Sequence, residues 1–188
     1  MPAEPPSDRR APELETLVGL FYDQPERLGQ FTEVEPDEMP EAPRRLLNHH
    51  AHMTVTVESF HQSSVDVEVL EDRADQDTYW RKILLRRQSD GGVVQFGIVR
   101  LDFRYVSEPV RREIEEQGTP LGRVLINHDV LRKVELHSLW RVAPGPELRE
   151  LLGLTTDEPV YGRTALIYCN GEPAVELLEI VTSDGPDS

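Results

Sequence analysis

Apolar and polar residues alternate along several stretches of the chain with a period of two, which is typical of β-strands that bury one face. Asp90-Gly91-Gly92 and Asn170-Gly171 each lie between two such stretches and predict tight hairpin turns. The pattern therefore favours strands joined as antiparallel hairpins. The predicted strands cover residues 53–58 (MTVTVE), 64–70, 79–87, 93–105, 164–169 and 174–182.

Helical signals are concentrated between the predicted strands. Ser107 can cap a helix that ends at Gly118, and residues 119–126 (TPLGRVLI) can form a second one. Residues 146–152 predict a short helix that Gly153 ends. Strands in hairpins, with helices gathered between them, predict an α+β fold: a single domain with a mostly antiparallel β-sheet and helices packed on it.

The first 47 residues differ from the rest, because they hold eight of the fifteen prolines and an excess of acidic residues. Apolar residues from Leu14 to Phe21 recur at helical spacing and predict a short amphipathic helix. Residues 31–43 (FTEVEPDEMPEAP) predict a proline-broken connector. A solvated lead-in is the favoured interpretation of this region, and a partner-binding arm is the alternative. The predicted division is an N-terminal segment 1–45, a domain 46–183 and a tail 184–188.

Length and charge narrow the class of protein. A chain of 188 residues fits one domain, and with one cysteine, Cys169, it forms no internal disulfide. A net charge of −15 argues against nucleic acid as the partner, since phosphate binding needs a basic face. The sequence shows neither an apolar run of membrane-spanning length nor the layout of a secretion signal. We therefore expect a cytoplasmic protein that binds neither nucleic acid nor membrane.

Two charged residues stand in apolar rows of predicted strands. Glu179 shares a strand face with Leu177 and Val181, and Arg81 shares one with Ile83. A carboxylate in such a row needs a partner or a raised pKa, and a guanidinium there needs a carboxylate from the protein or from a ligand. The two residues predict a pocket that binds an anion through Arg81 and carries out acid–base chemistry through Glu179. A structural ion pair or a sheet-edge position is the alternative for Glu179.

Other polar residues are open to more than one interpretation. Arg163, after Tyr161-Gly162, could point into a pocket or into solvent. The run from Asn48 to Met53 (NHHAHM) contains His49, His50 and His52, and His50 and His52 share one face if the segment is extended. Two alternate histidines fall short of the three or four ligands of a zinc site, so we expect no metal and interpret the run as a polar strand entrance. The sequence contains no nucleotide-binding glycine motif and no GxSxG.

The order of four motifs resembles that of chorismate-lyase-like proteins. YWRKILL at 79–85, TPLGR at 119–123, YGR at 161–163 and a GxP hairpin leading into the strand with Glu179 follow one another along the chain. The resemblance covers about residues 46–182, and TPLGR is its most specific part. It implies a chorismate-lyase-like α+β fold.

The resemblance also implies an activity, the cofactor-free elimination of pyruvate from chorismate to give 4-hydroxybenzoate by a carbon–oxygen lyase. On this basis Arg81 and Glu179 are the catalytic residues. Arg81 would hold the ring carboxylate together with the backbone amide of Leu121, and Glu179 would face the ring oxygen. The backbone of Met53 would line the same pocket.

The chain departs from the family pattern in one strand. It has Gly97-Ile98 where the family has a Gly-Arg pair, so Arg100 is a candidate substitute. Arg163 and Arg123 are candidates for the enolpyruvyl carboxylate. The expected partner is a small anionic aromatic or pre-aromatic substrate, with no cofactor. A non-catalytic binding module for a small aromatic acid, as in the effector domains of some transcription regulators, and a lyase acting on a related anion remain alternatives.

Overall fold

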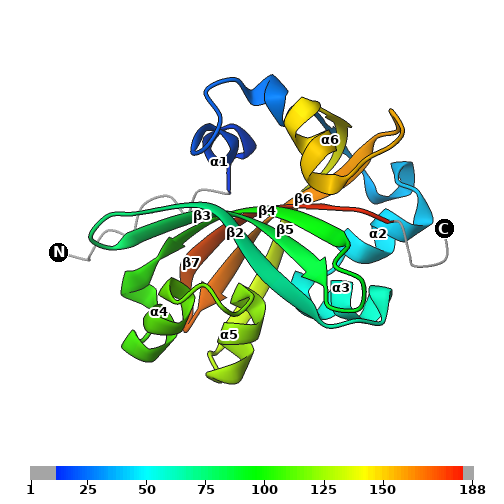
Figure 1. Cartoon of the computed structure of the whole chain (residues 1–188). Helices are drawn as coiled ribbons and strands as arrows, with labels where there is room; N and C mark the ends of the chain where they lie inside the picture. The colour runs from blue at the N-terminus through cyan, green and yellow to red at the C-terminus, as the bar shows by residue number, and fades with distance from the viewer. Residues whose placement is uncertain (1–11, 184–188) are drawn as a thin grey trace.

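A seven-stranded antiparallel sheet forms the centre of the computed structural model, which describes residues 12–183 (Figure 1). The strand order is β1-β5-β6-β7-β4-β3-β2, so the last strand of the chain, β7, lies at the middle of the sheet. Every neighbouring pair is antiparallel. The strands are β1 (Gly29–Val34), β2 (Val65–Ala74), β3 (Thr78–Arg87), β4 (Val93–Asp102), β5 (Arg132–Pro144), β6 (Val160–Cys169) and β7 (Glu172–Val181).

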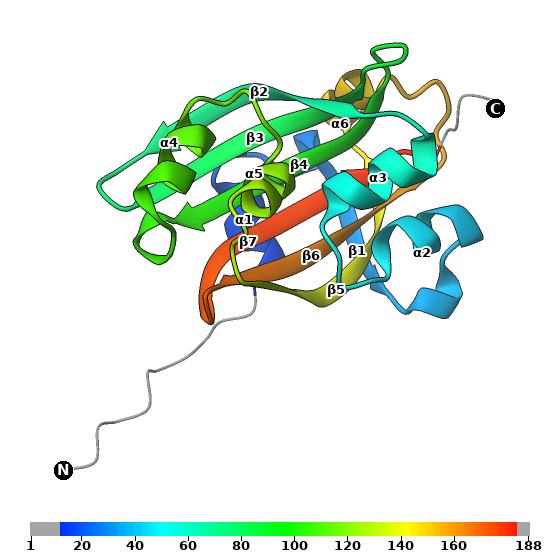
Figure 2. The ribbon, with the colours of Figure 1, turned by 90° about the horizontal axis from the view of Figure 1, so that it is seen from below.

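Helices cover both faces of this sheet. Helices α1 and α6 lie on one face, and α2, α3, α4 and α5 lie on the other (Figures 1 and 2). Short 3-10 helices occur at Pro25–Arg27, Pro36–Glu38 and Phe103–Tyr105. The α-helices are α1 (Leu14–Gly19), α2 (Glu41–Leu47), α3 (Met53–His61), α4 (Glu108–Glu115), α5 (Leu121–Asn127) and α6 (Pro146–Leu152).

The central strands are buried on both faces, which explains their nearly continuous apolar sequences. Along β4, Phe96 and Ile98 pack beneath α1 and α6, while Val99 and Leu101 pack beneath α4 and α5. Helices α2 and α3 form a third cluster on the same side as α4 and α5. The expected α+β fold with an antiparallel sheet is confirmed.

Most predicted elements match the structure. The stretches 64–70, 79–87, 164–169 and 174–182 correspond to β2, β3, β6 and β7, and 146–152 coincides with α6. The predicted tail, 184–188, and the first eleven residues lie outside the described part of the chain. No helix within residues 12–183 has the length and apolar character needed to cross a membrane.

The predicted strand at 53–58 is wrong, because these residues begin α3. Met53, Val57 and His61 are buried at intervals of four, while Val55 is 42% exposed, so the buried face has the period of a helix. β-Branched residues lower helix propensity by only a fraction of a kcal/mol each, about 0.5. Burial of Met53 and Val57 against α2 and the sheet outweighs that preference.

The connector predicted at 31–43 is also wrong, since it contains the end of β1 and the start of α2. Strand β1 pairs with β5, which the sequence pattern did not indicate. Strand β1 lies at the sheet edge and is largely exposed, so few apolar residues mark it. In β5 a register shift between Leu136 and Ser138 interrupts the alternation on which the prediction relied.

Candidate binding site

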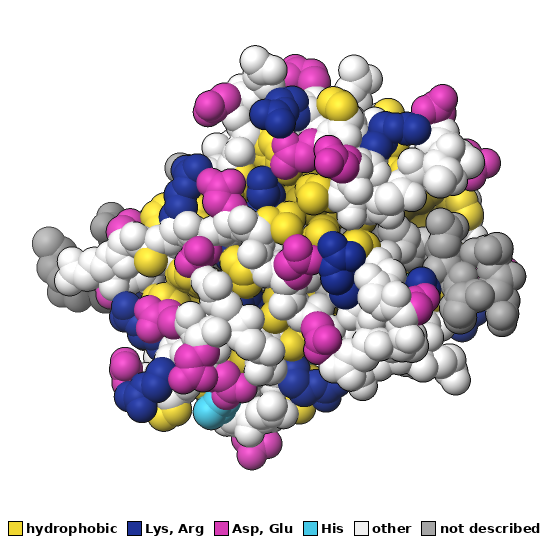
Figure 3. All heavy atoms as spheres, viewed as in Figure 1, with side chains coloured by type: hydrophobic (Ala, Val, Ile, Leu, Met, Phe, Trp, Pro, Cys, Tyr) yellow, Lys and Arg dark blue, Asp and Glu magenta, His cyan; other side chains and the backbone are white. Residues whose placement is uncertain are grey.

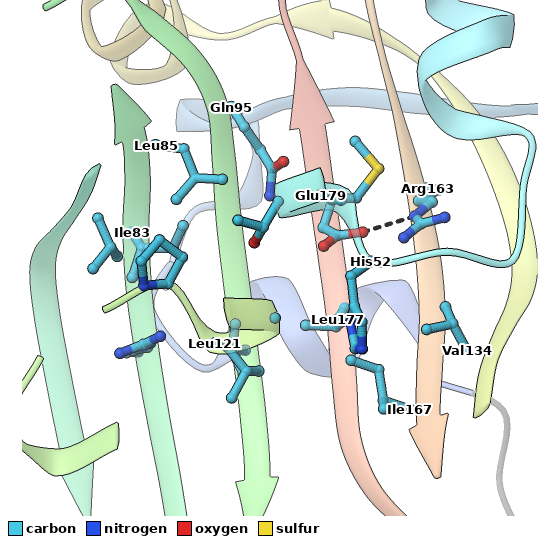
Figure 4. A pocket seen from close by; sticks show the side chains of 17 residues that line it. His52, Ile83, Leu85, Gln95, Leu121, Val134, Arg163, Ile167, Leu177 and Glu179 are labelled. Carbon is cyan, nitrogen blue, oxygen red and sulfur yellow. Dashed lines mark hydrogen bonds and ion pairs between the residues drawn. The ribbon is translucent and has the colours of Figure 1, made fainter. Parts of the chain in front are cut away.

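A small buried cavity lies between the central strands and the first residues of α3 and α5 (Figure 4). Its volume is about 40 Å³, which is enough for a few water molecules. Cavities that hold organic ligands are typically about 300–1,000 Å³, so an organic molecule could bind only if the walls move apart. Most of the lining is apolar. The polar and charged lining residues are His52, Thr54, Arg81, Gln95, Arg163 and Glu179.

The register of the sheet determines which polar side chains meet in the cavity. Glu179 on β7 lies directly opposite Arg163 on β6 and opposite Gly97 on β4. Gly97 in turn faces Ile83 on β3. Arg81 lies two residues from Ile83 along β3, so it shares this face of the sheet. The antiparallel register therefore brings residues from four strands to one surface.

Arg163 and Glu179 form a buried ion pair that also holds a loop. Arg163 is 0% exposed, and its Nε donates to Oε2 of Glu179 at 2.7 Å. The Nη1 of Arg163 donates to the carbonyl of His49 at 3.0 Å, and Nη2 donates to that of Ala51 at 3.1 Å. Arg163 thus fastens the α2–α3 loop to the sheet. The structural ion pair considered for Glu179 from the sequence is present.

Arg81 is also buried, but it forms no ion pair within the described residues. It is 2% exposed, and its Nη1 makes no hydrogen bond within the described residues. Burial lowers the pKa of the Arg81 guanidinium, while Tyr79 and the exposed Asp72 act in the opposite direction. An arginine side chain nevertheless stays charged at neutral pH. Since the charges of Arg163 and Glu179 compensate each other, Arg81 makes the cavity positive.

Two further buried polar atoms in the cavity wall lack partners within residues 12–183, Oε1 of Gln95 and Nε2 of His52. Gln95 is 3% exposed and His52 is 7% exposed. Buried polar atoms are satisfied in the great majority of cases. Together with Nη1 of Arg81, these atoms make three unmet hydrogen-bonding groups around one cavity, a pattern typical of a site that takes up a polar ligand or ordered water.

The positive cavity contrasts with the acidic composition of the whole chain. On the surface shown in Figure 3, acidic and basic side chains are interspersed. The net charge of −15 repels an anion at long range. Attraction therefore has to come from the cavity itself, where a low dielectric strengthens the field of Arg81.

The other residues proposed from the sequence separate into two groups. Met53 and Leu121 line the cavity at the starts of α3 and α5. Arg123 instead pairs with Glu58 between α5 and α3. Arg100 pairs with Glu176 on the opposite face of the sheet, because it alternates with residues that face the cavity side. The structure does not bring Arg123 or Arg100 to the cavity.

Sequence reasoning missed Gln95 and misjudged His52. Gln95 stands in the apolar run VVQFGIV, so the rule that singled out Arg81 would have found it as well. His52 precedes α3 as its N-cap residue and is not part of an extended strand entrance. Within the described residues no group of three or more His, Cys, Asp or Glu is arranged to hold a metal ion.

An open groove of about 760 Å³ lies outside the cavity. The groove and the cavity share His52 and Val134 in their walls. The groove is also lined by Leu131, which is 75% exposed, and by the exposed cations Arg132 and Lys133. The side chains of His52 and Val134 therefore separate the cavity from the groove.

His52 is expected to make the protein sensitive to acid. Burial, and then Arg132 and Arg163, lower the pKa of His52 from 6.5 to about 4. The folded state therefore resists protonation, whereas the unfolded state takes up a proton as the pH falls below 6.5. Stability should fall from pH 6.5 towards pH 4, with a loss of about 2 kcal/mol between pH 7 and pH 5.

Urea unfolding of the wild type and of His52→Gln at pH 7 and pH 5 measures this contribution. The variant should lose about 2 kcal/mol less between the two pH values than the wild type does. His50→Gln, at an exposed position of the same loop, is the matched control and should behave like the wild type. An equal loss in all three proteins would mean that His52 does not carry the effect.

The sheet, its two helical layers and the cavity define a single-domain α+β protein with a buried, positively charged internal site. No model of a protein family matches the sequence. A search of curated proteins also gives no match.

Three separate protein domains are among the solved structures with a similar course of the chain. A ligand-binding domain assigned to a GntR-family transcriptional regulator from Bordetella bronchiseptica has 16% identity and a TM-score of 0.46, with 64% of this chain and 87% of that chain covered. The effector domain of PhnF from Mycobacterium smegmatis has 12% identity and a TM-score of 0.48, with coverages of 70% and 88%. The C-terminal domain of the histidine utilization repressor from Pseudomonas syringae has 11% identity and a TM-score of 0.44, with coverages of 62% and 90%.

Proposed function

We propose that this protein is a binding module for a small organic acid, which it holds in the buried cavity with the carboxylate on Arg81. The observation that carries the proposal is the buried guanidinium of Arg81, whose Nη1 has no hydrogen-bond partner within the described residues. A carboxylate matches the planar fork of arginine and would compensate its charge. The apolar lining, including Ile83 and Leu177, suits the hydrocarbon body of such an acid.

The volume of the cavity sets a condition on binding. Because about 40 Å³ is too small for an aromatic acid, the walls must open. The loop between α2 and α3 is the wall that carries His52, and it contacts the sheet through hydrogen bonds from Arg163 to backbone carbonyls. Opening at His52 would join the cavity to the outer groove and give the acid a route inward.

Calorimetric titration with benzoate and 4-hydroxybenzoate tests the proposal directly. The wild type should bind at least one of these acids at a single site, and Arg81→Met should abolish the binding. Arg141→Met removes an exposed arginine from β5 and serves as the control that leaves binding unchanged. If the wild type binds neither acid, or if Arg81→Met binds as tightly as the wild type, the proposed function is wrong.

Cleavage of chorismate is the second candidate function. It is favoured by one observation, that Arg81, Glu179, Leu121 and Met53 all line a single cavity. The resemblance to chorismate-lyase-like proteins gives these same four positions to the substrate site. Against it, Glu179 is engaged in the ion pair with Arg163, so a dianionic substrate would find only the charge of Arg81 uncompensated.

Incubation with chorismate, with pyruvate and 4-hydroxybenzoate followed together, distinguishes the two functions. A lyase releases both products in equal amounts and loses activity in Arg81→Ala by about 100-fold or more, the usual scale for an oriented electrostatic contact. In that case Glu179→Gln should impair turnover more than Glu176→Gln does. We expect no product, together with binding of the aromatic acid, which is the outcome of a binding module.

A further inference from the structure

The side-chain amide of Gln95 is a second polar group of the cavity that no ion pair or loop contact explains. Gln95 is 3% exposed, and its Oε1 makes no hydrogen bond within the described residues. In Figure 4 its amide points into the cavity beside Leu85. A buried amide oxygen without a partner is costly, because it has lost its hydrogen bonds to water. The Oε1 atom of Gln95 would therefore be satisfied by a ligand atom that donates a hydrogen bond.

Gln95 and Arg81 lie at opposite ends of the cavity along the strands. Gln95 on β4 lies opposite Leu85 on β3, and Leu85 is four residues from Arg81 along the same strand. Four residues of an extended strand span about 13 Å between backbone positions, and both long side chains reach inward from these ends. The side chain between them on this face of β3 is the apolar Ile83. An acid with its carboxylate on Arg81 would thus direct its far end towards Gln95.

The charges around the cavity determine what that far end can be. Glu179 and Arg163 lie between the two ends, and they are paired with each other. Burial keeps His52 neutral at pH 7, since its pKa is about 4. A second anionic group on the ligand would therefore meet no free cation near Gln95 among the described residues. A neutral group that donates a hydrogen bond would meet an unsatisfied acceptor.

We propose that Gln95 determines specificity, by selecting organic acids that carry a neutral hydrogen-bond donor, such as a hydroxyl or amino group, at the end opposite the carboxylate. A hydroxyl group suits an amide in either orientation, because it both donates and accepts. This inference rests on the proposed function. It adds that the ligand is a monoanion and that a dianion of similar length is excluded.

A series of para-substituted benzoates tests this selectivity, since the carboxylate and ring stay constant while the far end changes. The probes are 4-hydroxybenzoate, 4-aminobenzoate, benzoate, 4-fluorobenzoate and terephthalate. The wild type should bind 4-hydroxybenzoate and 4-aminobenzoate about tenfold more tightly than benzoate and 4-fluorobenzoate, as expected for one buried hydrogen bond. Terephthalate, a dianion, should bind most weakly.

Gln95→Leu keeps the size of the side chain and removes its polar atoms. This variant should bind benzoate at least as tightly as the wild type and should lose the tenfold preference for 4-hydroxybenzoate. Gln30→Leu makes the same change at an exposed position of β1 and should keep the wild-type preference. Thermal unfolding of both variants verifies that they are folded before titration.

The outcomes separate this inference from the proposed function. If the wild type binds benzoate and 4-hydroxybenzoate equally through Arg81, or if Gln95→Leu keeps the preference, Gln95 is not the specificity residue although the cavity binds acids. If terephthalate binds as tightly as 4-hydroxybenzoate, the exclusion of dianions is wrong. If the wild type binds no member of the series, the proposed function itself fails.

Discussion

Arg81→Met is expected to abolish the binding of organic acids and, at the same time, to stabilise the ligand-free protein. Both effects follow from one feature, a buried guanidinium that forms no ion pair within the described residues and whose Nη1 has no hydrogen-bond partner there. In the complex this charge would form charge-assisted hydrogen bonds with a carboxylate. Loss of such a buried, oriented contact should weaken binding by about 100-fold or more.

Without ligand the same guanidinium lowers the free energy of unfolding. Transfer of a charged group from water into an apolar environment is unfavourable unless the group is paired. Methionine has a comparable length and no charge, so it can fill the space of Arg81 among Ile83, Val99 and Leu177. Replacing buried charges by apolar residues of similar size stabilises proteins by about 1–4 kcal/mol in favourable cases.

Urea unfolding and calorimetric titration of the same preparations measure the two effects together. The free energy of unfolding of Arg81→Met should rise by about 1–3 kcal/mol, while saturation by 4-hydroxybenzoate disappears. Arg81→Lys retains the charge but not the planar fork, so it should bind weakly and gain less stability. A variant that loses stability together with binding would indicate that Arg81 has a structural role.

The alternation of apolar and polar residues along the strands was sufficient to find Arg81 and Glu179, but it did not show which residues these two side chains contact. It placed Arg81 and Glu179 in apolar rows, and in the structure both side chains are buried. It could not show that Glu179 meets Arg163, because this contact depends on the register between two strands of a hairpin with a shift at Ile167 and Tyr168. It also could not show that Arg81 forms no ion pair with any residue between 12 and 183.

Local pattern failed where tertiary packing decides the structure. Residues 53–58 alternate as a strand would, yet the space between α2 and the sheet buries Met53 and Val57 as a helix. Strand β1 has a weak apolar signal, because it lies at the sheet edge, where only Phe31 and Val34 among its residues pack against the apolar clusters. Arg100 is a different case, because the resemblance suggested it as a substitute for the family's arginine, whereas in β4 its side chain alternates with those on the cavity side and pairs with Glu176.

Breaking the pair of Arg163 and Glu179 is expected to cause the largest loss of stability in the molecule. Glu179→Leu leaves the fully buried Arg163 without its carboxylate, and Arg163→Met leaves the buried Glu179 alone and releases the carbonyls of His49 and Ala51. Removal of one partner from a buried ion pair typically destabilises a protein by about 3–5 kcal/mol. Each single variant should therefore unfold at a much lower urea concentration.

The double variant Arg163→Met with Glu179→Leu should be more stable than the sum of the two single losses predicts, because it buries no unpaired charge. The pair of Arg100 and Glu176 provides the matched cycle, since it is a cross-strand ion pair on the other face with side chains 33% and 19% exposed. Partly exposed pairs contribute about 0–1 kcal/mol, so that cycle should show little coupling.

The coupling energy also decides what Glu179 can do chemically. A coupling of several kcal/mol would mean that Glu179 is held as the carboxylate partner of Arg163, and giving a proton to a ligand would then require breaking this interaction. Small coupling would leave the carboxyl group free to act on a bound ring oxygen and would favour the lyase. The contacts of Arg163 with Glu179, His49 and Ala51 favour strong coupling, and hence a cavity that binds an acid through Arg81 without cleaving it.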